Sequence, residues 1–175
     1  MTSAVGARAR DKFMTAVRVV APLIIEIPLC SNRGPALDPM VLAVGGQLGD
    51  YWCVHAMQYC GRAVGNLWPF PVTGYCPTIF GVAKARGMVR ESWAHGEPGD
   101  LVLYWDETLG RFAHIGALWS LDVHNFQIET YEGNTSNPAH AGDPNDPTGR
   151  NGVGFYRKHR TLEKGDVLID WTKGL

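Results

Sequence analysis

The stretch EPGDLVLYW, residues 97–105, marks the point at which the chain changes from helical to strand-like patterns. Its first four residues predict a turn, because proline and glycine favour turn conformations, and the apolar run that follows is typical of a strand. Beyond it, Gly110 predicts a hairpin turn. Runs of β-branched and aromatic residues then predict further strands at residues 112–119, 126–132, 152–158 and 167–171. The C-terminal half is therefore predicted to be a β-meander.

Helical patterns lie on the N-terminal side of this turn, at residues 7–20, 53–65 and 78–86. Residues 21–49 are rich in proline and are predicted to be irregular. Helices that precede strands, instead of alternating with them, favour an α+β fold with N-terminal helices packed on an antiparallel sheet. A length of 175 residues suits a single structural domain overall, in which residues 1–45 are expected to pack on a main unit that spans residues 46–175.

Charge and hydropathy narrow the choice of partners. A net charge of −1 gives no reason to expect nucleic acid or an acidic membrane surface as a partner. No run of 18 apolar residues is present, so we expect no membrane span. Residues 13–25 are largely apolar and follow three basic residues, as in a secretory signal, but Arg18 interrupts the run and no small-x-small site follows. An amphipathic N-terminal helix is the expected structure.

The four cysteines do not form a recognisable metal or disulfide pattern. If residues 53–65 form a helix, Cys53 and Cys60 are separated by about 10 Å along its axis, too far for a disulfide. Cys30, Cys60 and Cys76 are expected to be core or loop thiols, which leaves Cys53 as the candidate reactive thiol. The acidic turn at residues 143–146 lacks the spacing of a known calcium loop, so we expect no metal and no cofactor.

Cys53 lies where a turn-like stretch becomes an amphipathic helix, with Asp50 as the predicted N-cap. The unpaired N–H groups and the dipole of a first helical turn favour a thiolate. His114, on a predicted strand, can store the proton as imidazolium and later give it to a leaving amine. On the next strand, either Glu132 or Asn134 can orient the imidazole. A cysteine, a histidine and then a carboxylate or amide, in this order, predict a cysteine hydrolase.

The chain resembles the CHAP domain (cysteine, histidine-dependent amidohydrolase/peptidase) in YWCVHAM at 51–57, PGDLVLY at 98–104, AHIGA at 113–117 and EGNT at 132–135. The segment GRNGVGFYR at 149–157 is also similar to phage-type members, so that the resemblance covers residues 45–160. It implies a papain-like fold of the NlpC-type superfamily and hydrolysis of peptidoglycan amide bonds. It further implies that Cys53 is the nucleophile, His114 the general base, Glu132 the orienting group and Asn134 a polarising group.

Other residues near Cys53 have candidate roles. The backbone N–H of Cys53 is a candidate oxyanion donor, since first-turn N–H groups are unpaired. Gln47 lies six residues before the nucleophile, as the oxyanion glutamine does in papain-like proteases, and Tyr51 is a second side-chain candidate. Trp52 is expected to pack beside the nucleophile and to wall a substrate groove. His55, on the other side of the predicted helix, is expected to be solvated, as is His124.

The resemblance implies bacterial peptidoglycan as the partner and leaves amidase and endopeptidase specificity open. A phage endolysin would wait in the host cytoplasm for a holin-type pore before its release to the cell wall, whereas a virion-associated lysin would sit among phage tail proteins. A non-catalytic wall-binding or virion structural module with the same fold is one alternative. A papain-like protease or transferase that acts on proteins is the other.

Overall fold

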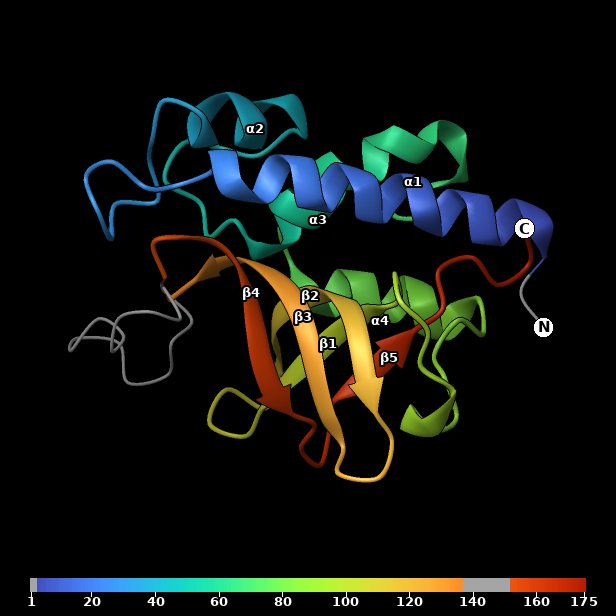
Figure 1. Cartoon of the computed structure of the whole chain (residues 1–175). Helices are drawn as coiled ribbons and strands as arrows, with labels where there is room; N and C mark the ends of the chain where they lie inside the picture. Colours follow the sequence, from blue (N-terminus) through green and yellow to red (C-terminus); the bar gives the residue numbers. More distant parts are fainter. Residues whose placement is uncertain (1–2, 137–151) are drawn as a thin grey trace.

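The computed structural model describes residues 3–136 and 152–175 and shows an α+β fold, as the sequence predicts (Figure 1). Its helices are α1 (Ala4–Val20), α2 (Leu37–Ala43), α3 (Cys53–Gly61) and α4 (Cys76–Ala85), with 3₁₀ turns η1 (Ala21–Leu23), η2 (Arg62–Leu67) and η3 (Trp93–His95). The strands are β1 (Leu101–Asp106), β2 (Arg111–Asp122), β3 (Gln127–Thr135), β4 (Gly154–Thr161) and β5 (Val167–Ile169). Across residues 3–136 and 152–175, no helix combines the length and the apolar character needed to cross a membrane.

The five strands form one antiparallel sheet in the order β4-β3-β2-β1-β5. The predicted meander is therefore correct from β1 to β4 but wrong for β5, which pairs with β1 at the opposite edge. Leu168 and Ile169 are both fully buried, one in each of the two hydrophobic clusters that flank the sheet. Pairing with β1 covers both side chains and closes an edge that would otherwise expose backbone hydrogen-bonding groups.

Residues 21–49 are less irregular than predicted, because they contain α2. Leu37, Met40 and Val41 form a buried stripe at helical spacing, which the high proline content of the region obscured. Pro39 lies in the first turn of α2, where a missing N–H is tolerated. The helix expected at 53–65 is also different, since α3 ends at Gly61 and the chain continues as the 3₁₀ turn η2.

Two helices begin earlier in the structure than the sequence patterns indicate. The N-cap Ser3 accepts a hydrogen bond from the N–H of Gly6 at 3.0 Å, so that α1 begins at Ala4. The second shift affects the site, because α4 begins at Cys76 with Pro77 in its first turn. A cysteine therefore lies at the start of α4, as it does at the start of α3.

One hydrophobic core joins the N-terminal helix to the sheet. Phe13 and Val17 of α1 lie in the same buried cluster as Met57 of α3 and Ile115 of β2. In Figure 1, α1 runs across the upper part of the molecule, below α2, with α3 between it and the sheet. The helix that carries Cys53 is therefore held between α1 and the strands that carry His114 and Glu132.

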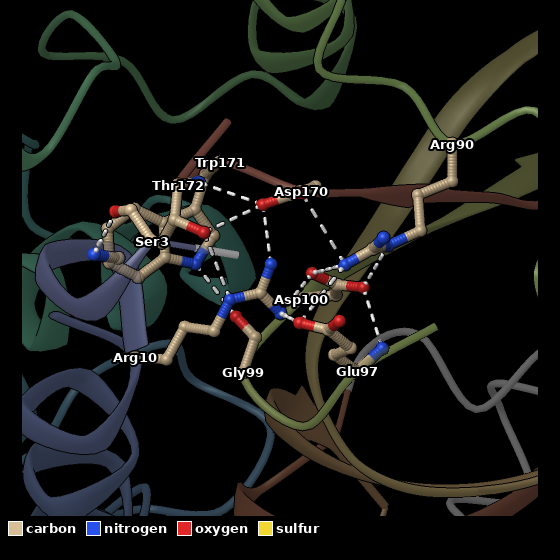
Figure 2. Close-up of polar contacts among 10 residues, drawn as sticks. Ser3, Arg10, Arg90, Glu97, Gly99, Asp100, Asp170, Trp171 and Thr172 are labelled. Atoms are coloured by element: carbon tan, nitrogen blue, oxygen red, sulfur yellow. Dashed lines mark hydrogen bonds and ion pairs between the residues drawn. The ribbon is translucent and has the colours of Figure 1, made fainter. Parts of the chain in front are cut away.

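The Pro-Gly-Asp turn before β1 is anchored by a buried ionic network (Figure 2). Asp100 is fully buried and forms ion pairs with Arg10, at 2.7 Å from Nη1, and with Arg90, at 2.5 Å from Nε. Arg10 also forms an ion pair with Asp170 Oδ1 at 2.5 Å, and its Nε donates a hydrogen bond to Thr172 Oγ1 at 3.0 Å. The network ties α1, the turn and the segment after β5 together. Asp100 of the Pro-Gly-Asp segment thus has a structural role in this chain.

We expect Asp100→Asn to destabilise the fold, because Arg10 and Arg90 would lose the carboxylate between them. Removing one partner of a buried ion pair costs about 3–5 kcal/mol. Urea unfolding followed by circular dichroism measures the effect, with Arg33→Gln in the exposed Arg33–Asp38 pair as the control. Equal free energies of unfolding for Asp100→Asn and the unmodified protein would contradict the structural role.

Candidate active site

Cys53 is the first residue of α3, as predicted, and its side chain is almost buried, at 5% exposure. The thiol of Cys76 forms a hydrogen bond with its sulfur and lowers the pKa of Cys53 most strongly. Burial acts in the opposite direction, while His114 and the backbone N–H of Val54 lower the pKa further. The net pKa of Cys53 lies well below its ordinary value, which favours the thiolate form.

His114 lies in the middle of β2 and is also buried. Its Nε2 is 3.0 Å from Glu132 Oε2, which leaves Nδ1 for the sulfur of Cys53. The ring of Tyr104, which is opposite in register on β1, stacks on the imidazole with centroids 5.7 Å apart. Burial alone would lower the pKa of His114, but its hydrogen bonds to Cys53 and Glu132 raise it to about 9. His114 is therefore placed to act as an imidazolium.

Glu132 on β3 is fully buried and is the group that bonds to His114. Arg160 of β4 donates to both of its oxygens, at 2.6 and 2.5 Å. Tyr104 and Thr130 donate to Oε1 at 2.9 and 2.6 Å. Burial would raise the pKa of Glu132, but the hydrogen bonds from His114 and Arg160 hold it well below its ordinary value. The carboxylate thus remains charged beneath the imidazole.

Two glycines explain how these side chains approach so closely. A Cβ on Gly116, two residues after His114, would lie 2.8 Å from Cγ of Glu132. A Cβ on Gly133 would lie 2.6 Å from Cβ of Ala56 on α3. Both distances are shorter than a van der Waals contact. The first glycine lets Glu132 approach His114, and the second lets α3 pack against β3.

His114 Nε2 is paired with Glu132, and the described residues show no hydrogen bond between His114 and Asn134. Asn134 lies at the end of β3 in a left-handed conformation, with φ at 56°, and its side chain is buried. Among the described residues, its Oδ1 has no hydrogen-bond partner. Of the two alternatives for the orienting group, the structure thus places Glu132 beside His114, whereas the polarising role of Asn134 remains a prediction.

The structure overturns the predicted role of Trp52 as a groove wall. Its side chain is fully buried, and its indole Nε1 donates to Glu26 Oε1 at 2.8 Å. By contrast, the two oxyanion candidates Gln47 and Tyr51 are exposed, and Tyr51 has 65% of its surface accessible. Their oxyanion roles remain predictions, since the groups that the structure places on the Cys53 sulfur are Cys76, His114 and the N–H of Val54.

His55 is buried, contrary to the prediction that it is solvated. A Cβ on either Gly46 or Gly74 would lie within 3 Å of the imidazole, so the ring fills the space between these two backbones. Asp50 does not cap α3 as predicted; its Oδ2 lies 3.2 Å from His55 Nε2 and accepts from the N–H of Gln47 at 2.8 Å. The loop before Cys53 is therefore held to α3 by His55. His124 is exposed, as predicted.

Sequence reasoning missed Cys76 and Arg160. The start of α4 could have been placed at Cys76, because Pro77 favours the first helical turn. No comparable signal exists for Arg160, which lies in a run of basic residues at 157–160. Its contact with Glu132 depends on the register of β3 against β4, which a single sequence does not show.

Arg160→Gln should impair the site by removing one of the two cationic partners of Glu132. The loss of positive charge is expected to move the acid limb of Cys53 alkylation to higher pH and to reduce turnover by at least about tenfold. Arg160→Lys should restore part of the turnover and part of the shift in the pH profile, because lysine returns the positive charge but not the bidentate hydrogen bonding. The control is Arg157→Gln, which removes an exposed arginine paired with Glu129 on the same two strands. An unchanged pH profile in Arg160→Gln would assign Arg160 a purely structural role.

Metal ligation finds no support in the part of the chain that the structure describes, where no group of three or more His, Cys, Asp or Glu side chains could hold an ion. The acidic turn at 143–146 lies outside the described residues. Comparison of the chain with protein-family models, curated proteins and solved structures gives no match in any of the three. The geometry of the site therefore carries the functional argument.

Proposed function

We propose that this chain is a cysteine-dependent peptidoglycan hydrolase with a papain-like fold of the CHAP type. The observation that carries the proposal is the buried relay of Cys53, His114 and Glu132. It combines a thiolate at a helix start, an imidazolium and a charged carboxylate, the three parts that a cysteine acyl-transfer site requires. The resemblance of the surrounding segments to CHAP domains supplies the substrate class.

The proposed reaction begins when the Cys53 thiolate attacks the carbonyl carbon of an amide bond. Backbone N–H groups at the start of α3 stabilise the tetrahedral oxyanion, and His114 gives its proton to the departing amine. The acyl group is then bound to sulfur as a thioester. Neutral His114 removes a proton from a water molecule, which attacks the thioester and releases the acid product. Glu132 keeps the imidazole in one orientation throughout.

The relay also supports an enzyme over a non-catalytic wall-binding module. Buried charges are costly, and a binding module needs no thiolate–imidazolium pair in its interior. Perturbed pKa values of this kind concentrate at functional sites. We therefore place the protein among lytic enzymes of a phage or bacterium, acting either at lysis from the host cytoplasm or at entry from a virion tail.

Digestion of purified peptidoglycan, followed by mass analysis of the fragments, tests the proposal. New L-alanine amino termini would identify an amidase, and new termini within the stem peptide or cross-bridge would identify an endopeptidase. Cys53→Ala protein serves as the matched control. An absence of new termini with the unmodified protein, together with cleavage of a denatured protein substrate, would replace peptidoglycan by protein as the substrate.

The pH dependence of the reaction should show an alkaline limb near the pKa of His114, about 9. The pKa is raised, so the imidazolium form is complete at lower pH and is lost as pH rises through this value. Above it, the leaving amine lacks a proton donor and kcat/KM should fall. Initial rates on a soluble muropeptide between pH 5 and 10 provide the measurement. A rate that keeps rising up to pH 10 would show that His114 does not act as the general acid.

A further inference from the structure

We propose that two loops, residues 45–51 before α3 and residues 71–75 before α4, form one wall of the substrate-binding site, with Tyr75 as its main contact. The wall binds an uncharged, apolar part of the peptide that adjoins the scissile amide. The inference rests on the proposed function in that Cys53 is the nucleophile, and it deepens that function by assigning a substrate-binding surface next to it.

The two loops lie side by side. A Cβ on Gly45 would lie 2.7 Å from Cγ1 of Val72, so the loops touch each other directly. The buried imidazole of His55 fills the space behind them, because a Cβ on Gly46 would lie 2.7 Å from its Cε1 and one on Gly74 would lie 2.6 Å from its Nε2. His55 belongs to the first turn of α3, the helix that begins with the nucleophile. Both loops are therefore packed against the start of that helix.

Polar contacts with α3 fix each loop in one position. In the first loop, Asp50 Oδ2 lies 3.2 Å from Nε2 of His55. In the second, the backbone oxygen of Pro71 accepts a hydrogen bond from Nε2 of Gln58 at 2.6 Å. A surface that is already ordered loses little conformational freedom when a ligand binds, which favours affinity. The wall is thus arranged before substrate arrives.

Tyr75 lies between the elements that carry the nucleophile and the general base. Its neighbour Gly74 packs against His55 of α3. On its other side, the guanidinium of Arg111 lies over the Tyr75 ring, 5.3 Å from the centroid. Arg111 begins β2, the strand on which His114 lies. The ring is held by this contact and is still 49% exposed, so one part of it is open to a ligand.

The composition of the wall determines the chemistry of its ligand. Leu48, Tyr51 and Val72 are exposed on the same two loops as Tyr75. The only charged residue in either loop is Asp50, which is paired with His55. Apolar and aromatic side chains that are exposed beside a reactive group are typical of binding surfaces for apolar ligands. An uncharged stretch of peptide with apolar side chains fits this surface, whereas a strongly charged one does not.

The first test is Tyr75→Ala, with initial rates measured on a soluble muropeptide. We expect KM to rise by roughly tenfold, because an aromatic contact is lost, and kcat to stay within about twofold, because the contact is equally strong before and during the reaction. Tyr75→Phe keeps the ring and should keep the unmodified KM. The control Phe126→Ala removes an exposed aromatic side chain from the turn between β2 and β3 and should also leave KM unchanged. Alkylation of Cys53 by iodoacetamide should be equally fast in all four proteins, because this small reagent does not need the wall.

The second test displaces the loop without touching Tyr75. Gly74→Ala places a methyl group against His55, so we expect KM to rise as the loop moves. Gly81→Ala in α4 is the matched control, because an added Cβ there meets no atom within 4 Å. His55→Ala frees the space that the new methyl group needs. The effect of Gly74→Ala on KM should therefore be smaller in the His55→Ala background than in the unmodified protein. Circular dichroism establishes that each variant is folded.

The outcomes distinguish this inference from the proposed function. An unchanged KM for Tyr75→Ala in a protein that cleaves peptidoglycan would overturn the inference alone. A fall in kcat and in Cys53 alkylation at constant KM would do the same, because it would assign Tyr75 to the support of the nucleophile. If the unmodified protein cleaves denatured protein but not peptidoglycan, a raised KM of Tyr75→Ala for that substrate would keep the wall and overturn the proposed substrate.

Discussion

Cys53→Ala is expected to abolish peptidoglycan cleavage while the fold is retained. The sulfur is the only atom that the substitution removes, and alanine is the residue most compatible with a helix. Loss of the nucleophile removes covalent catalysis altogether, so we expect a decrease in turnover of at least about 10⁴-fold. The measurement is release of soluble fragments from purified cell walls, with circular dichroism to confirm folding. Substantial residual activity would remove Cys53 from the mechanism.

The same experiment with His114 tests whether the two residues act together. His114→Ala should be nearly as damaging as Cys53→Ala, and the double variant should be little worse than either one, because members of one catalytic unit are not additive. Multiplicative losses would indicate that Cys53 and His114 contribute independently. The close contact of the two side chains in the structure favours the first result.

Glu132→Gln should produce the second largest effect, on both activity and stability. The substitution keeps the shape of the side chain but removes the charge that pairs with His114 and Arg160. We expect turnover to fall by about 10³–10⁴-fold, as when a triad carboxylate becomes an amide. Because the buried ion pair loses its anion and leaves the half-buried Arg160 without a partner charge, the free energy of unfolding should also fall by about 3–5 kcal/mol.

Stability as a function of pH checks the charge state of Glu132. Its pKa is lowered in the folded protein, so its contribution is present above the ordinary carboxylate pKa of about 4.3 and is lost as pH falls through the folded pKa. Glu132→Gln should remove this part of the acid dependence. Glu129→Gln, the same chemical change on the exposed side of β3, is the matched control and should retain it. Identical acid unfolding of all three proteins would show that Glu132 is not held as a carboxylate.

Asn134→Ala separates the two candidates for the third catalytic residue. The amide does not contact His114, so we expect a lower rate with little change in the pH profile, in contrast to Glu132→Gln. If Asn134→Ala moved the alkaline limb and Glu132→Gln did not, the assignment of the two residues would be reversed.

The sequence by itself determined the α+β class, all five strand positions and the helix start at Cys53. These features depend on local signals: alternation along strands, helical spacing of apolar residues, and turns set by glycine and proline. The sequence also predicted Cys53, His114 and Glu132 as candidate site residues in this order, since each lies in a short motif. Local signals failed at α2, where prolines masked a buried helical stripe.

The tertiary structure alone decided which of these residues meet. The pairing of β5 with β1, the contact of Arg160 with Glu132 and the contact of Cys76 with Cys53 join segments far apart in the chain. Strand register and helix packing set such contacts through the burial of whole faces, and one sequence does not reveal either. The burial of Trp52 and His55 follows from the same cause, because α3 is enclosed by α1, α2 and the sheet rather than exposed on one side.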